Sequence, residues 1–114
     1  MRAIRRLLFA VGGILALTTG IGLADNTGAA GNPTKADAAK RGEAVFLSHG
    51  CTYCHDDGGR AAGKGPKLMG TTRDDSFITF RIMNGKPGLM PAFGGSIDAD
   101  QLADLIAYIR SLKD

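Results

Sequence analysis

Three separate segments of the chain are predicted to be helical, and hydrophobic residues recur at helical spacing in the first and the last of them. The first runs from about residue 34 to 49 and opens with Thr34-x-x-Asp37 after a proline, which resembles a capping box. The second runs from about residue 73 to 83 and ends at Asn84-Gly85, a pair that commonly stops a helix. No segment alternates convincingly between apolar and polar residues as a strand would. The pattern predicts a small all-α domain.

The last segment carries the clearest helix signals. Asp98 is a suitable N-cap, and Gln101 follows three residues later, as in a capping box. Ile97 and Leu102 occupy the two positions of a hydrophobic staple. A single apolar stripe continues along the helix, as expected for an amphipathic helix that packs on a core. The stripe consists of Leu102, Leu105, Ile106, Ile109 and Leu112.

The first residues have the pattern of a secretory signal peptide. Arg2, Arg5 and Arg6 make a basic start, and residues 7–22 are apolar or small. Gly22-Leu23-Ala24 then supplies small residues at a suitable cleavage site, so we expect cleavage after Ala24. The alternative is an uncut membrane tether. The apolar run is short for a spanning helix and rich in glycine, which favours cleavage.

The chain therefore divides into three predicted parts. A signal peptide occupies residues 1–24, a flexible leader residues 25–36, and one folded domain residues 37–114. Cleavage would leave 90 residues with eleven basic and eleven acidic side chains, so the mature protein would be formally neutral. This balance gives no reason to expect nucleic-acid or anionic-membrane binding. A domain this small often relies on a metal, disulfides or a cofactor for its stability.

Cys51-Thr52-Tyr53-Cys54-His55 is the most informative stretch of the chain. A C-x-x-C-H run is the attachment signature of a c-type haem. Two thiols three residues apart on one helical turn are each able to add across a haem vinyl group, and the histidine is then placed to bind the iron. The chain has two cysteines, and the motif uses both. We expect one haem c, attached covalently through Cys51 and Cys54.

Three other interpretations of this motif are weaker. A thioredoxin-like redox pair follows a strand in a βαβ pattern, whereas the flanking sequence here is helical. A structural zinc site normally needs four Cys or His ligands, and the chain offers two of each in all. A plain disulfide would leave His55 without a role. The other histidine, His49, is expected to be a solvated residue at a helix end rather than a ligand.

A haem iron held by His55 has a second axial position, for which Met90 is our choice. Met90 lies in a loop of residues 85–95 that is rich in glycine and proline, and Pro91 stiffens the loop next to it. A thioether ligand raises the reduction potential. Packing in a core is the alternative role for this methionine. The candidates that rank below Met90 are Met69, Met83, His49 and the lysines.

From about Lys40 to Leu112, the chain resembles a class I c-type cytochrome, the monohaem type with His and Met ligands. The spacing of 35 residues from His55 to Met90 is closer to small bacterial periplasmic members than to mitochondrial-type ones. The matching pieces, in chain order, are Gly42 with Phe46, Cys51-x-x-Cys54-His55, Gly65-Pro66-Lys67-Leu68, Met90-Pro91, and Leu105-Ile106-Ala107-Tyr108-Ile109.

The resemblance implies a cytochrome c-like helical fold around the haem and gives roles to several residues. Gly42 would let the first and last helices cross closely, since a side chain there would push the backbones apart. The Pro66 carbonyl would accept a hydrogen bond from the distal ring nitrogen of His55, and Leu68 would press on the haem plane. The expected cofactor-binding residues are Cys51, Cys54, His55, Pro66, Leu68 and Met90, with His55 and Met90 as the iron ligands.

The function expected from these features is that of a periplasmic one-electron carrier, not an enzyme. Its partners would be periplasmic redox proteins, with a quinoprotein-type dehydrogenase as donor and a terminal oxidase as acceptor, and the carrier would be a monomer. A haem-based sensor or small haem enzyme with an open or displaceable sixth ligand is the alternative. A subunit that stays bound to a dehydrogenase or oxidase is a third possibility.

Charge suggests how such a carrier could dock. Basic residues fall in the segments expected around the haem, whereas Asp98, Asp100 and Asp104 lie at the start of the last helix. A basic front and an acidic back would orient the protein toward an acidic partner. We give equal weight to the alternative that these residues form a solvated surface of mixed charge. The expected basic front consists of Arg60, Lys64, Lys67, Arg73, Arg81 and Lys86.

Overall fold

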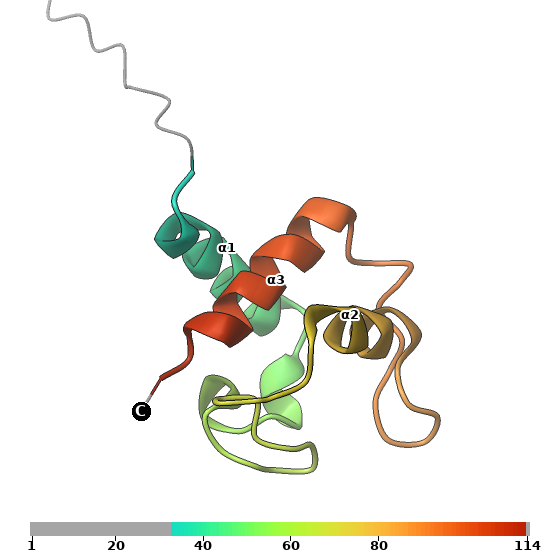
Figure 1. The fold of residues 1–114 in the computed structure, drawn as a ribbon. Helices are drawn as coiled ribbons and strands as arrows, with labels where there is room; N and C mark the ends of the chain where they lie inside the picture. The colour runs from blue at the N-terminus through green and yellow to red at the C-terminus, as the bar shows by residue number, and fades with distance from the viewer. Residues whose placement is uncertain (1–32, 114) are drawn as a thin grey trace, which may run out of the picture.

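The computed structural model describes residues 33–113, which form a helical domain (Figure 1). Within this range the only strand-like pairing is an isolated bridge between Lys86 and Met90, which confirms the all-α prediction. No helix within residues 33–113 is long and apolar enough to cross a membrane. The predicted signal peptide and most of the predicted leader lie outside the described residues. The elements are α1 (Lys35–Ser48), the short 3₁₀ helices η1 (Cys51–Tyr53) and η2 (Asp57–Gly59), α2 (Asp75–Asn84) and α3 (Ala99–Ser111).

Capping boxes define where α1 and α3 begin. The Thr34 hydroxyl accepts a hydrogen bond from the Asp37 amide at 3.1 Å, and the Asp37 carboxylate accepts one from the Thr34 amide at 3.0 Å. Asp98 and Gln101 make the same exchange at α3, at 2.8 and 3.0 Å. Both boxes confirm the sequence prediction. The first box starts α1 within the predicted leader, so the last two residues of that leader are helical.

The helix α2 begins later than the sequence analysis predicts. The predicted start is near Arg73, but the helix begins at Asp75 because Asp74 takes the N-cap position. The Asp74 carboxylate accepts a hydrogen bond from the Phe77 amide at 2.7 Å. Gly85, with a φ of 67°, then ends the helix as expected. Arg73 consequently belongs to the segment that leads into α2.

The helices α1 and α3 cross at close range, and Gly42 makes this possible (Figure 1). A Cβ at Gly42 would overlap the carbonyl oxygen of Asp104 and would lie 2.8 Å from the Cβ of Tyr108. One turn further along α1, the Phe46 ring packs on Tyr108 with 5.3 Å between the ring centroids. The crossing that the resemblance implies is therefore confirmed.

The apolar core lies around this crossing and extends to α2. Leu105, Ile109 and Leu112 of the predicted stripe are buried, whereas Leu102 and Ile106 are only partly buried. Tyr108, which lies between the stripe positions, is buried as well. The buried hydrophobic residues are Val45, Phe46, Ile78, Ile82, Ile97, Leu105, Tyr108, Ile109 and Leu112.

The substitution Gly42→Ala should lower the free energy of unfolding by about 2–3 kcal/mol, because the new methyl group would force two helix backbones apart. Denaturant unfolding of the purified protein would measure this change. Gly95→Ala is the matched control, since a Cβ at Gly95 meets nothing within 4 Å. The control should stay within about 0.5 kcal/mol of the parent protein. Equal destabilisation of both variants would contradict the role given to Gly42.

Candidate functional site

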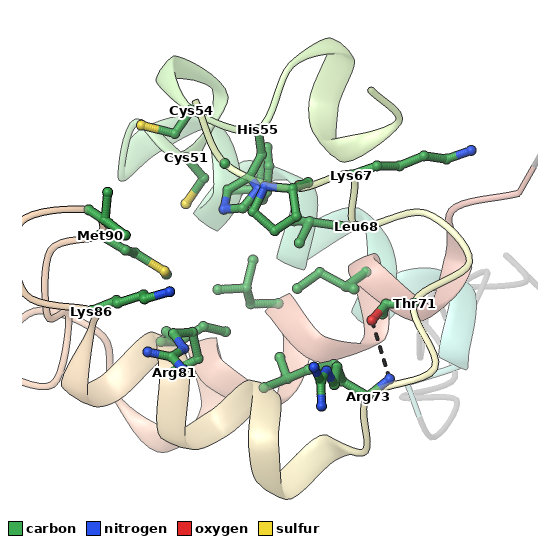
Figure 2. A pocket seen from close by; sticks show the side chains of 18 of the residues that line it. Cys51, Cys54, His55, Lys67, Leu68, Thr71, Arg73, Arg81, Lys86 and Met90 are labelled. Carbon is green, nitrogen blue, oxygen red and sulfur yellow. Dashed lines mark hydrogen bonds between the residues drawn. The ribbon is translucent and has the colours of Figure 1, made fainter. Parts of the chain in front are cut away.

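A cavity of about 600 Å³ opens between α2, α3 and the loops on either side of α2 (Figure 2). Its volume falls within the ~300–1,000 Å³ typical of small-molecule and cofactor sites. The first turn of the C-x-x-C-H motif forms one wall, and the turn that carries Met90 forms another. The apolar residues of the lining are Phe46, Pro66, Leu68, Phe77, Ile78, Ile82, Leu89, Met90, Leu105 and Ile109.

The motif is held in a tight turn directly after α1. Gly50, with a φ of 70°, reverses the chain in the left-handed conformation that glycine adopts readily. The amide of His55 then donates to the carbonyl of Cys51 at 2.9 Å. Cys51 and Cys54 are both free thiols, and both line the cavity. Burial raises the pKa of the Cys51 thiol, so this group stays protonated at neutral pH.

The imidazole of His55 is fixed in orientation and tautomer. His55 is 9% exposed, and its Nδ1 lies 2.7 Å from the carbonyl oxygen of Pro66. Because a carbonyl oxygen only accepts, Nδ1 carries a proton, and in the neutral imidazole the free lone pair is then on Nε2. The Phe46 ring lies 6.4 Å from the imidazole between centroids, and a Cβ at Gly65 would lie 2.7 Å from its Cε1 atom. A ring held this way is able to offer Nε2 to a metal.

The loop that follows the motif is anchored at two places. The amide of Leu68 donates to the carbonyl of Gly59 at 2.9 Å. The hydroxyl of Tyr108 in α3 donates to the carbonyl of Gly58 at 2.8 Å, and burial raises the pKa of this tyrosine, so it remains a donor. These bonds keep Pro66 and Leu68 at the cavity wall, where both line the space.

A tight backbone turn presents Met90 to the cavity. Lys86 and Met90 exchange two backbone hydrogen bonds of 2.8 Å each. Pro87 and Gly88 occupy the corner, and Gly88 has a φ of 74°, as in a type II turn. Gly85 closes the base of the turn, where a Cβ would lie 2.5 Å from the carbonyl oxygen of Met90. The positive φ at Gly88 and the close approach at Gly85 explain the two glycines, and Pro87 suits the first corner position of such a turn.

Among the methionines of residues 33–113, Met90 alone lines the cavity. Figure 2 shows its sulfur and the His55 ring reaching the same space from different segments. Met69 and Met90 both pack against the hydrophobic core, but Met69 does not line the cavity. The carbonyl of Met83 accepts a hydrogen bond from the amide of Gly94 at 3.1 Å, which ties the segment after Met90 to α2. Met90 thus differs from the two lower-ranked methionines in lining the cavity, and its role as an iron ligand stays a prediction.

His49 lies outside the cavity, at the C-terminal end of α1. Its ring nitrogens lie 3.0 Å from the carbonyl oxygen of Val45 and 3.3 Å from that of Ser96. The ring also packs edge-on against Phe93, with 6.2 Å between centroids. His49 is a helix-end residue, as expected, but it is half-buried rather than simply solvated. It links α1 to the segment that follows Met90.

The wall of the cavity is basic. Five of the six residues of the expected basic front line it, and no Asp or Glu of residues 33–113 does. Arg60 is the exception and lies outside the lining. On the expected acidic side, Asp104 pairs with Arg41 at 2.8 Å, and this hydrogen bond lowers the pKa of the carboxyl. The basic lining residues are Lys64, Lys67, Arg73, Arg81 and Lys86.

Sequence reasoning missed Phe77 as a site residue. Phe77 lines the cavity, and the guanidinium carbons of Arg73 and Arg81 lie 4.7 and 5.3 Å from the centroid of its ring. The signal available was the spacing of four residues between Phe77 and Arg81, because such positions share one face of a helix.

The residues at this cavity fit one cofactor. Two free thiols, an imidazole with a free Nε2 and a large apolar space are the groups that a covalently attached porphyrin needs. Together with the three-helix fold, they define a class I c-type cytochrome. One haem c is attached through Cys51 and Cys54, and the function of such a domain is electron transfer.

The chain belongs to the family described as cytochrome c oxidase, cbb3-type, subunit III, whose model matches residues 37–109. It is 34% identical over 94 residues to the Cbb3-type cytochrome c oxidase subunit FixP of Bradyrhizobium diazoefficiens, a match that covers 72% of this chain and 30% of that protein. The FixP subunit of Azorhizobium caulinodans is 29% identical over 90 residues, with 70% and 29% covered. The chain therefore spans less than a third of the length of these relatives.

The chain is also similar to one cytochrome c6 and to one solved structure. Cytochrome c6 of Diacronema lutheri is 42% identical over 38 residues, which cover 33% of this chain and 45% of that protein. The crystal structure of cytochrome cL from Hyphomicrobium denitrificans superposes with a TM-score of 0.59 at 27% identity. That match covers 67% of this chain and 48% of the other.

Replacing Gly85 by alanine should open the turn that carries Met90, because the new Cβ would collide with backbone atoms at the base of the turn. Native-state hydrogen exchange should then show the amides of Lys86 and Met90 exchanging at least about tenfold faster, the effect of ~1.4 kcal/mol of local destabilisation. Gly88→Ala is the control, since Gly88 also has a positive φ but faces open space. Similar acceleration in both variants would mean that backbone strain, rather than the collision, controls the turn.

Proposed function

We propose that this protein is an exported one-electron carrier whose haem iron is bound axially by His55 and Met90. The observation that carries the proposal is the turn at Lys86–Met90, which holds a thioether at the cavity while Pro66 holds the imidazole of His55 with its Nε2 free. When bound, the haem supplies a centre that changes between Fe(II) and Fe(III). The protein's part is to fill both axial positions, so that neither oxidant nor substrate reaches the metal.

The surroundings of these two ligands support a carrier rather than an enzyme. The Pro66 carbonyl would keep the proton on Nδ1 of His55 in both oxidation states, and Leu68 would cover one face of the porphyrin. A rigid turn at Met90 limits the rearrangement that accompanies each electron. A neutral thioether also favours the reduced metal and so raises the reduction potential.

The family suggests which proteins accept and donate the electron. The FixP relatives are named as subunits of a cbb3-type cytochrome c oxidase. A terminal oxidase is therefore the proposed acceptor, and a periplasmic dehydrogenase of quinoprotein type is the proposed donor. We expect a monomer that docks transiently through a small interface, with no role in nucleic-acid binding. The same electron-transfer function is also possible for a subunit that stays bound to an oxidase. Co-purification with the oxidase would distinguish this bound subunit from a mobile carrier.

The proposed location follows from the predicted leader. A signal peptide at residues 1–24 would deliver the chain to the periplasm, with a flexible leader at residues 25–36 before the domain of residues 37–114. An uncut segment would instead tether the domain to the membrane. Mass measurement of the exported protein decides between the two forms.

The substitution Met90→Ala should lower the reduction potential and make the ferrous protein bind carbon monoxide, because it removes one axial ligand. Visible spectra with and without carbon monoxide, together with a redox titration, would show both changes. Met83→Ala is the matched control, since Met83 does not line the cavity and should leave both properties near those of the parent protein. Ready binding of carbon monoxide by the parent protein would instead favour the sensor or enzyme function.

A further inference from the structure

His49 contacts both parts of the chain that carry the expected iron ligands. It is the C-cap of α1 and stands directly before the turn that leads into the C-x-x-C-H motif. Its ring reaches the segment that follows Met90, where Nε2 lies 3.3 Å from the carbonyl oxygen of Ser96. The ring also packs edge-on against Phe93 of the same segment. One side chain therefore connects the end of α1 with the chain beyond Met90.

The segment that His49 contacts is otherwise attached to α2. The amides of Phe93 and Gly94 donate to carbonyls in the last turn of α2, at 2.9 and 3.1 Å. These bonds, like the two that close the Met90 turn, lie within α2 and the loop that follows it. The contacts of His49 differ because they come from α1. They tie the methionine loop to the helix from which the motif continues.

The two ring nitrogens of His49 have separate partners. Nδ1 lies 3.0 Å from the carbonyl oxygen of Val45 and 3.2 Å from the hydroxyl of Ser48, both on α1. Nε2 faces the carbonyl of Ser96. A carbonyl oxygen only accepts, so a hydrogen bond to Ser96 needs a proton on Nε2, and in the neutral ring Nδ1 is then able to accept from the Ser48 hydroxyl. Nδ1 thus serves the helix end, and Nε2 serves the bridge to the other segment.

We propose that His49 is a positioning residue for Met90, because its Nε2 bridge to Ser96 holds the methionine loop in place relative to the motif. The inference rests on the proposed function, in which His55 and Met90 fill the two axial positions. Opening of the loop would break the bridge, so the bridge lowers the population of the open form. A single hydrogen bond changes such an equilibrium by about two- to tenfold.

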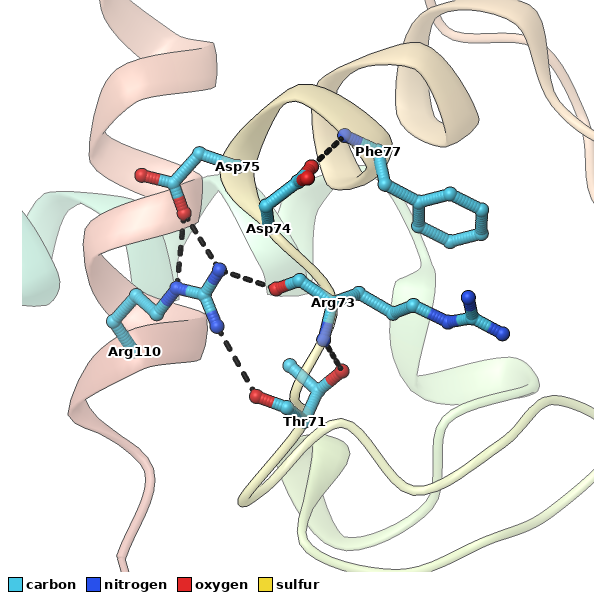
Figure 3. Close-up of polar contacts among 6 residues, drawn as sticks. All are labelled: Thr71, Arg73, Asp74, Asp75, Phe77 and Arg110. Carbon is cyan, nitrogen blue, oxygen red and sulfur yellow. Dashed lines mark hydrogen bonds and ion pairs between the residues drawn. The ribbon is translucent and has the colours of Figure 1, made fainter.

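The segment before α2 is attached to α3 in a comparable way (Figure 3). The Arg110 guanidinium donates to the carbonyl of Thr71 at 3.2 Å, to the carboxylate of Asp75 at 2.7 Å and to the carbonyl of Arg73. Thr71 and Arg73 line the cavity, but this segment carries neither expected ligand of the iron. Loss of the Arg110 side chain should therefore loosen one wall without releasing Met90. The substitution Arg110→Gln supplies a control for such general loosening.

Two substitutions separate the bridge from the end of α1. Asparagine places its amide near the position of Nδ1, so His49→Asn keeps the contact with α1 and removes the bridge. Glutamine is one methylene longer and places its amide near the position of Nε2, so His49→Gln keeps the bridge. Both variants replace the ring by a neutral amide and lose its packing on Phe93. A difference between the two variants therefore reports on the bridge to Ser96.

The test is a titration of the oxidised, haem-loaded protein with imidazole, which competes with Met90 for the iron. Loss of the far-red sulfur-to-iron absorption band follows this competition. In His49→Asn the apparent association constant should rise about three- to tenfold, because the loop opens more often. In His49→Gln and Arg110→Gln the constant should stay within about twofold of that of the parent protein.

Hydrogen exchange of the same haem-loaded samples locates the change without reference to the iron. The amides of Phe93 and Gly94 should exchange about three- to tenfold faster in His49→Asn than in the parent protein. His49→Gln should restore most of the slow exchange, because its amide again reaches the Ser96 carbonyl. Denaturant unfolding of each variant would show whether a loss of stability in the whole domain contributes.

Equal imidazole constants in the two His49 variants would overturn the positioning role. A rise in Arg110→Gln as large as that in His49→Asn would overturn it as well, because any loosened wall would then admit imidazole. Absence of the far-red band from the oxidised parent protein would instead contradict Met90 as a ligand. Hydrogen exchange at Phe93 and Gly94 would still show whether the bridge holds the segment, so the two failures are distinguishable.

Discussion

The contact of α1 with α3 at Gly42 is the constraint on which the rest of the domain depends. A Cβ at this position would overlap the backbone of α3, so the two helices are as close as their main chains permit. The end of α1 leads directly through Gly50 into the C-x-x-C-H motif. On the partner helix, Tyr108 anchors the loop after the motif, and Arg110 anchors the segment before α2. A change in the crossing would therefore move the walls of the haem cavity relative to each other.

The groups proposed to bind the iron are supplied by loops, and each loop is held by backbone hydrogen bonds. The Pro66 carbonyl reaches His55 because the loop after the motif is bonded back to itself and to α3. Met90 is presented by a turn closed by two hydrogen bonds and tied to α2. This arrangement lets a domain with a small apolar core hold ligands from distant parts of the sequence. The porphyrin then completes the core, since core residues such as Leu105 and Ile109 also line its cavity.

Much of this arrangement could be predicted from local chemistry. The capping boxes at Thr34 and Asp98 depend on residues three positions apart, and the helix stop at Gly85 depends on a single glycine, so the sequence alone indicates them. The bridge made by His49 was not predictable in this way, because its second partner, Ser96, is brought near only by the tertiary fold. The start of α2 was misplaced for a local reason. No apolar residue marks the first turn between residues 70 and 76, and the cap at Asp74 decides where the helix begins.

The basic residues that line the cavity differ in exposure, and the chemistry of their side chains fits the difference. Lysine carries a compact, strongly hydrated charge, which suits the exposed positions of Lys64, Lys67 and Lys86 at the rim. Arginine is less strongly hydrated and stacks on aromatic rings, which suits Arg81, half-buried beside Phe77. Arg73 contacts the same ring but is exposed, so it shares the rim with the lysines. The exposed positive charges around the cavity would be free to meet an acidic redox partner.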